Sequence, residues 1–240
     1  MPVLELSGAA VEMEGQGQWS DLTLSLDEGA ACALIGPNRG GKTLALKLCA
    51  GLVTPEQGAA RLFGQDLNEL NEEGLAELRQ RVGTVLQAPG LLSNMTVFNN
   101  VALPLRYHRG LSDEELEPLV MVRLEALGVA GLRHRFPAEL NQGEARCVAI
   151  ARALSLDQEL LLLDDPLEGL DALTSRRLGE WLQAQRQSRP LTILATTRRA
   201  SSLLAMVDRF AFVRDGRVQA QGRYEELLAS ADDGMKDYLQ

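Results

Sequence analysis

A glycine-rich segment near the N-terminus carries the residue types that hold a phosphate chain. Residues 36–43 read Gly-Pro-Asn-Arg-Gly-Gly-Lys-Thr and fit the pattern G-x-x-x-x-G-K-[ST]. In such a loop the backbone N–H groups converge on the phosphates, the lysine reaches the β- and γ-phosphates, and the hydroxyl ligates Mg²⁺. The sequence therefore predicts a nucleotide site whose loop consists of Gly36, Pro37, Asn38, Arg39, Gly40, Gly41, Lys42 and Thr43.

A pair of carboxylates in the second half of the chain completes this chemistry. Asp164 and Asp165 follow an uninterrupted leucine run at 160–163. An acid at the C-terminal end of a buried strand lies beside the phosphate loop in such folds, so we expect Asp164 to be a partner of Mg²⁺, either as a direct ligand or through another ligand of the ion. Asp165 is then placed to accept a proton from the attacking water. The alternative for Asp165 is an acid in a solvated turn.

These residues need a sheet to bring them together, and the chain has the pattern of one. Alternating apolar and polar residues predict half-buried strands at 3–6 and 22–26. Short apolar runs predict buried strands at 30–35, 160–163 and 191–195.

Helices are predicted between these strands. They cover 42–50, ended by Gly51, then 112–128 with a capping box at its start, and two more from about 143 and from 171. From 68 to about 132 the chain is mostly helical, apart from one strand-like stretch at 82–87. Alternating strands and helices favour an α/β fold with a mostly parallel sheet covered on both faces. A chance match to the phosphate pattern in a chain with 22 glycines is the alternative, and this order of elements argues against it.

Composition excludes several classes of protein. The chain has 240 residues, of which 45% are hydrophobic and 24% charged, with a formal net charge of -9. This charge argues against nucleic acid as a partner, because no excess of cations is available to displace counterions. No apolar run reaches the roughly 18 residues of a membrane-spanning helix, and the N-terminus lacks the basic start of a secretory signal. Three scattered cysteines predict reduced thiols in the core of a cytosolic protein.

The order of motifs resembles the ATP-binding subunit of ABC transporters over essentially the whole chain. Gln87 is similar to the Q-loop glutamine of this family, which contacts Mg²⁺ and the transmembrane subunit. The signature motif, which in this family contacts the nucleotide of a partner ATPase subunit, corresponds to Asn141, Gln142, Gly143 and Glu144. The D-loop corresponds to residues 168–171 with Asp171. The resemblance implies a P-loop NTPase fold with a mixed or parallel sheet core, an antiparallel β part and a helical subdomain. It also implies ATP as the nucleotide, with Mg²⁺ held by Thr43, Gln87 and Asp164.

The resemblance implies one domain over 1–240. Residues of about 1–87 and 158–240 form the nucleotide-binding core, and about 88–157 form the helical subdomain with the signature motif. Residues 94–105 and 124–128 resemble the ATPase of MCE-type (Mla) phospholipid transport systems. The expected partners are membrane permease subunits, a second ATPase subunit in a homodimer or heterodimer, and an MCE-type substrate-binding protein within the complex. The expected location is the cytoplasmic face of the inner membrane, attached through the permease.

Several positions depart from the family pattern, and they cluster at the chemistry. Arg39 replaces a glycine, and Asn141 and Gln142 replace the serine and first glycine of the signature. Asp165 replaces the catalytic glutamate, and Thr197 replaces the switch histidine.

A further departure concerns the adenine. The position that usually supplies a stacking aromatic is Val11 or Met13, and Trp19 lies too late in the chain.

Two hypotheses follow from these departures. In the first, the chain is the ATPase of a lipid transporter, slowed by the altered residues. In the second, it is a catalytically degenerate subunit that binds nucleotide and has a regulatory or structural role in a heteromeric complex. A soluble ATPase of the DNA-repair kind is more remote, because such proteins have a long coiled-coil insert that the chain lacks.

Overall fold

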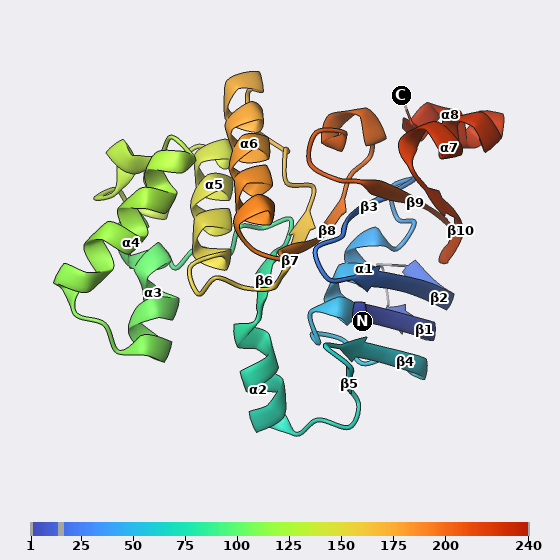
Figure 1. Cartoon of the computed structure of the whole chain (residues 1–240), viewed down its shortest axis with the longest axis horizontal. Coiled ribbons are helices and arrows are strands. Elements are labelled where there is room, and N and C mark those ends of the chain that lie inside the picture. Colours follow the sequence, from blue (N-terminus) through green and yellow to red (C-terminus); the bar gives the residue numbers. More distant parts are fainter. Residues whose placement is uncertain (1, 14–16, 240) are drawn as a thin grey trace.

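The centre of the molecule is a mixed β-sheet, shown in Figure 1. The computed structural model describes residues 2–13 and 17–239. In this part of the chain the strands are hydrogen-bonded in the order β5-β4-β1-β2-β10-β9-β3-β8-β7-β6. Their bounds are β1 Pro2–Met13, β2 Gly17–Asp27, β3 Ala31–Ile35, β4 Gln57–Leu62, β5 Gln65–Asp66, β6 Val82–Val85, β7 Leu160–Asp164, β8 Thr192–Thr196, β9 Arg209–Arg214 and β10 Arg217–Gly222.

The parallel part of the sheet brings the predicted chemistry to one edge. β3 pairs in parallel with β8 and β9, β8 with β7, and β7 with β6. In this register Thr196 is the partner of both Leu34 and Asp164. The carboxyl ends of β3, β7 and β8 therefore lie side by side, which is where α/β sheets bind ligands.

The antiparallel part forms the other half of the sheet. β1 pairs with β2 and β4, β4 with β5, and β9 with β10, all antiparallel. Figure 1 shows β1, β2 and β4 on one side of the molecule and the helices α3 and α4 on the other, with α5 and α6 between them. The predicted mixed sheet with an antiparallel part is confirmed.

Helices cover both faces of the sheet. They are α1 Lys42–Cys49, α2 Glu72–Gln80, α3 Val97–Arg109, α4 Asp113–Ala126, α5 Gln142–Ala153, α6 Ala172–Ser188, α7 Tyr224–Ser230 and α8 Asp233–Leu239. The first core lies under α3 to α6 and takes alternate side chains of the central strands, among them Leu161 and Leu163. The second core lies under α1 and the antiparallel strands and takes the residues that alternate with these, Leu160 and Leu162.

The predicted elements are present, with corrected boundaries. The strand predicted at 3–6 is longer and runs over Pro2–Met13. Its pairing with β2 shifts register twice between Leu6 and Val11, and the pairing resumes after each shift, so the strand continues to Met13. The helix predicted at 112–128 spans Asp113–Ala126, and the Glu115 carboxylate accepts hydrogen bonds from the N and Oγ of Ser112 at 2.9 and 2.8 Å.

The three cysteines are predicted to be unpaired thiols in the core. Cys32 and Cys49 lie in the second core, Cys147 lies in the first, and all three are buried and free. The expected unpaired core thiols are confirmed.

Candidate active site

A cavity of about 600 Å³ opens at the carboxyl edge of the parallel strands. Its lining joins the phosphate loop, the segment after β6, the acids after β7 and the residues after β8. The residues are Asn38, Arg39, Gly40, Gly41, Lys42, Thr43, Leu44, Lys47, Leu86, Gln87, Ala88, Asp164, Asp165, Glu168, Thr196, Thr197 and Arg198. The structure thus brings together most of the loop residues predicted from the sequence with Gln87, Asp164, Asp165 and Thr197.

The phosphate loop takes its shape from backbone constraints. Gly36 has φ 139°, and a Cβ there would lie 2.1 Å from the carbonyl oxygen of Val213, so only glycine fits. Gly41 has φ 94° and directly precedes α1, so the loop ends at a helix N-terminus, where backbone N–H groups favour anions.

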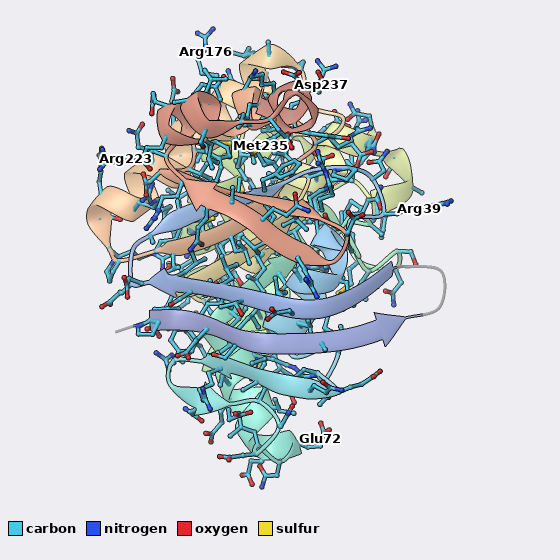
Figure 2. The ribbon with its side chains drawn as sticks, turned by 90° about the vertical axis from the view of Figure 1, so that its right-hand side faces the viewer. Arg39, Glu72, Arg176, Arg223, Met235 and Asp237 are labelled. Atoms are coloured by element: carbon cyan, nitrogen blue, oxygen red, sulfur yellow. The ribbon has the colours of Figure 1, made fainter. Side chains whose placement is uncertain are left out.

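Arg39 also has a left-handed backbone, with φ 62°. Its side chain is exposed and points away from the ribbon in Figure 2, although the residue lines the cavity. The residue therefore adds an exposed cation to the lining of the cavity.

Lys42 is folded back along the loop. Its Nζ donates hydrogen bonds of 2.8 Å to the carbonyl oxygens of Gly36 and Pro37. Burial lowers the pKa of this ammonium, and the carboxylates of Asp164 and Asp165 raise it in part. Among the described residues, the lining of the cavity does not include Gly36 or Pro37. These two residues contact the site through the carbonyl oxygens that bind Lys42.

Side-chain oxygens of Asp164, Thr43 and Thr196 form a cluster in the same cavity as Lys42. Asp164 is buried, and its Oδ2 accepts a hydrogen bond from Thr43 Oγ1 at 2.9 Å while its Oδ1 accepts one from Thr196 Oγ1 at 2.5 Å. The exposed Gln87 lines the same cavity. In the part of the chain that the structure describes, no group of three or more His, Cys, Asp or Glu residues could hold a metal. Mg²⁺ does not need one, since nucleotide sites bind it through one or two carboxylates and the substrate phosphates, so these oxygens fit the ion.

Asp165 is held in an uncommon conformation at the end of β7. Its φ is 46°, and its backbone N–H donates to Thr196 Oγ1 at 3.1 Å. Burial raises the pKa of the Asp165 carboxyl, and the nearby Arg198 lowers it to a lesser extent. A carboxyl with a raised pKa in a polar cavity is a candidate proton acceptor.

Thr197 is buried and its hydroxyl is already engaged. The Oγ1 lies 3.2 Å from the carbonyl oxygen of Arg199, to which it donates, and 3.1 Å from Ser202 Oγ. The residue therefore lines the cavity, but its hydroxyl is used to shape the turn after β8.

Two arginines at this site, Arg146 and Arg198, were not predicted from the sequence, and Glu168 was expected only as part of the D-loop. Arg146 is fully buried and donates to the carbonyl oxygens of Gln87, Asp164 and Glu168 at 3.0 to 3.2 Å, and to the Glu168 carboxylate at 3.2 Å. Glu168 and Arg198 line the cavity. The available signal for Arg146 was a lone cation before the apolar run at 147–151 of α5, where burial requires partners.

The predicted signature segment lies at the start of α5. Asn141 Oδ1 accepts from the N–H of Glu144, and Glu144 Oε2 accepts from the N–H of Asn141, both at 2.9 Å. A Cβ on Gly143 would lie 2.5 Å from the carbonyl oxygen of Gly169, so this segment packs against the predicted D-loop.

The D-loop ends where Asp171 caps α6 through the N–H of Thr174. Of the described residues that line the cavity, none belongs to 141–144 or is Asp171. The structure therefore does not bring residues 141–144 or Asp171 into the cavity of the same chain, whereas Glu168, the first residue of the D-loop, lines it.

The adenine position falls partly outside what can be described. Val11 is buried in the second core. The side chains of Met13 and Trp19 lie outside the described residues.

Comparison with known proteins gives consistent results. The family model described as ABC transporter matches residues 19–168. The intermembrane phospholipid transport system ATP-binding protein MlaF of Haemophilus influenzae is 34% identical over 89% of this chain and 81% of its own length. MlaF of Escherichia coli K12 is 30% identical over 92% and 82%. A solved structure described as the ATP binding subunit of an ABC transporter superposes with a TM-score of 0.82 and 26% identity, covering 98% of this chain and 94% of that one.

Proposed function

The chain belongs to the ABC transporter family as an ATP-binding subunit, and on that premise we propose that it hydrolyses ATP to drive phospholipid transport. The observation that carries the proposal is the convergence of Lys42, the Thr43–Asp164 pair and Asp165 on one cavity. The MlaF relatives, which are named for intermembrane phospholipid transport, support the lipid as cargo.

ATP binding follows from the loop and its lysine. The N–H groups of the loop and of the first turn of α1 converge on the β- and γ-phosphates. Lys42 exchanges its two carbonyl partners for phosphate oxygens, which carry full negative charge and therefore bind an ammonium more strongly. Thr43, Gln87 and Asp164 would hold Mg²⁺, which when bound neutralises phosphate charge.

Hydrolysis needs a base for the attacking water, and we assign this role to Asp165. The water oxygen forms a bond to the γ-phosphorus while the bond from that phosphorus to the β–γ bridging oxygen breaks. The electron pair leaves with ADP, and the Asp165 carboxylate takes the proton of the water. Aspartate is shorter than the glutamate of the family by one methylene, and a misplacement of about 1 Å costs on the order of 10²-fold in rate. We therefore expect slow turnover.

A second ATPase subunit is part of the proposal. Residues 141–144 lie outside the cavity of their own chain, as expected of a segment that acts on a neighbour. The side-chain oxygen Oδ1 of Asn141 caps α5. The N–H₂ group of the same side chain is therefore the end that can donate to a γ-phosphate of the partner. The same proposal divides the chain into a nucleotide-binding core, about 1–87 and 158–240, and a helical subdomain, about 88–157.

Membrane attachment is proposed to occur through the permease, at the cytoplasmic face of the inner membrane. Among the described residues, no helix combines the length and the apolar character that crossing a bilayer requires. An MCE-type substrate-binding protein would belong to the same complex.

The hypothesis of a nucleotide-binding subunit without turnover receives no support from the comparisons. The convergence of the residues that the resemblance assigns to phosphate and metal favours hydrolysis.

The decisive experiment measures ATP turnover of the purified protein with and without its permease subunits, beside a nucleotide-binding titration. We expect slow basal turnover that rises with the permease in lipid. Lys42→Ala should weaken ATP binding by roughly 10- to 100-fold, the effect of losing a charged hydrogen bond to phosphate, with an unchanged circular dichroism spectrum. Unchanged affinity in this variant would contradict the assignment of the loop, and transport of a solute other than phospholipid would contradict the cargo.

A further inference from the structure

Arg198 lines the cavity and is positively charged. The roles proposed above for the phosphate loop, for Asp164 and for Asp165 do not involve it. It stands two residues after Thr196, the last residue of β8, and lines the same cavity as Lys42. Its side chain is 62% exposed, and its Nε lies 3.6 Å from Asp165 Oδ2. This distance is an ion pair without a close hydrogen bond, so the donors of the guanidinium are available to a stronger acceptor.

The other carboxylates in the described lining of the cavity are held more firmly. The carboxylate of Glu168 pairs with Arg146, whose side chain is fully buried, at 3.2 Å. The carboxylate of Asp164 accepts two threonine hydroxyls and is buried. Asp165 is the described carboxylate of this cavity that is opposed by an exposed and extensible side chain.

The neighbour of Arg198 cannot supply a proton or a charge in its place. Thr197 is where the family resemblance places a histidine, but its hydroxyl is engaged with the Arg199 carbonyl and Ser202. The turn fixed by these contacts leaves residue 198 as the charged group that this segment presents to the cavity.

We propose that Arg198 is a γ-phosphate-binding residue that exchanges partners during the ATPase cycle. It pairs with the Asp165 carboxylate when the γ-phosphate is absent and moves to the γ-phosphate oxygens when ATP is bound. This exchange places a cation on the transferred group and frees Asp165 to face the attacking water. Arg198 forms no covalent bond and keeps its protons throughout. The inference rests on the proposed ATPase function.

The test compares two nucleotides that differ in the γ-phosphate. Equilibrium affinities of the full chain for ADP and for AMP-PNP, a non-hydrolysable ATP analogue, are measured with Mg²⁺ present. Arg198→Ala should weaken AMP-PNP binding by roughly 10- to 100-fold and ADP binding by less than about threefold. Arg198→Lys should retain part of the difference, because it keeps the charge but loses the planar fork. Arg199→Ala is the matched control, since it removes an exposed arginine next to this position that is not part of the described cavity lining, and we expect both affinities to be unchanged.

A double-mutant cycle with Asp165→Asn tests the exchange itself. Removing the Asp165 charge frees Arg198, so AMP-PNP binding should tighten in the parent background by a larger factor than in Arg198→Ala. Equal factors in the two backgrounds would mean that Arg198 does not exchange partners.

The outcomes separate this inference from the function on which it rests. If Arg198→Ala weakens ADP and AMP-PNP equally, leaves both unchanged, or speeds turnover, the assignment of Arg198 fails, while loss of binding in Lys42→Ala still upholds the nucleotide site. If the parent protein binds neither nucleotide, the proposed function fails and Arg198 loses its role with it.

Discussion

At the scale of single residues, Asp165 carries a charge where its surroundings oppose one. Burial raises the pKa of this carboxyl in the folded protein, so the native state binds its proton more tightly than the unfolded chain does. The free energy of unfolding therefore falls as the pH rises through the interval above the ordinary aspartate value of 3.8.

Asp165→Asn should accordingly stabilise the nucleotide-free protein near neutral pH. Asparagine removes the buried charge and accepts the left-handed backbone. The melting temperature of the variant should exceed that of the parent at about pH 7, and the gain should shrink as the pH falls towards about 4. A gain that is independent of pH would mean that the charge is not its source. Loss of ATP turnover in the same variant is expected, because the base is gone.

Asp165 and Thr197 are also where restoration of the family pattern should act. Asp165→Glu together with Thr197→His should raise turnover by well over about tenfold, since a base of proper reach and a titratable partner act on one transition state. The two changes should be more than additive. ATP hydrolysis by the two single variants and the double variant in the permease complex measures this.

A different result would locate the slow step elsewhere. If the double variant gains nothing until Asn141→Ser and Gln142→Gly are added, closure of the paired subunits limits turnover. No gain in either background, with ATP binding retained, would contradict the assignment of Asp165 as base.

The sequence was sufficient for the residues whose role depends on local pattern. Lys42, Thr43 and Asp164 are recognisable because a loop between a strand and a helix, and an acid after a buried strand, define their places. Arg146 and Arg198 could not be found in this way, because their partners are 18 to 59 residues away for Arg146 and 33 away for Arg198. The packing of α5 against the sheet determines the partners of Arg146, and the register of β7 with β8 determines the partner of Arg198.

At the scale of elements, the contact between the start of α5 and the segment before α6 depends on glycine. A Cβ on Gly143 would lie 2.5 Å from the carbonyl oxygen of Gly169, and backbone cannot give way as a flexible side chain can. Gly143→Ala should therefore lower the free energy of unfolding by about 1–3 kcal/mol. Gly131→Ala is the control, because a Cβ there meets nothing within 4 Å.

Thermal or denaturant unfolding of both variants checks this prediction. Stability equal to that of the parent in Gly143→Ala would mean that α5 and the D-loop separate readily. In the complex, we expect this variant also to reduce turnover, since the displaced residues 141–144 are those proposed to act on the partner.

The elements themselves were predictable where periodicity is strong. The buried strands and the capped helices follow from leucine runs and from Ser112 with Glu115. The sequence does not predict the extension of β1 to Met13. The register shifts of this strand interrupt the alternation of polar and apolar side chains from which strands are predicted. Irregular pairing of this kind depends on how β1 pairs with β2 and β4, and local pattern does not reveal that pairing.

At the scale of the whole molecule, the net charge of -9 bears on membranes. An acidic surface is repelled by anionic lipid, and attachment should need a protein partner. We expect the purified chain to remain in the supernatant with protein-free anionic liposomes at physiological salt, and to sediment with membranes when the permease is co-expressed. Tight binding to the liposomes alone would contradict attachment through the permease.

The three cysteines are divided between the two faces of the sheet, Cys32 and Cys49 on one and Cys147 on the other. Burial raises the pKa of Cys32 and of Cys147 to about 12, and it raises that of Cys49 as well. A thiol reagent can then modify each cysteine only during an opening of its own surroundings, and the labelling rate reports the free energy of that opening. The labelling rates of these native cysteines therefore measure the local opening of each face of the sheet separately, without an engineered cysteine.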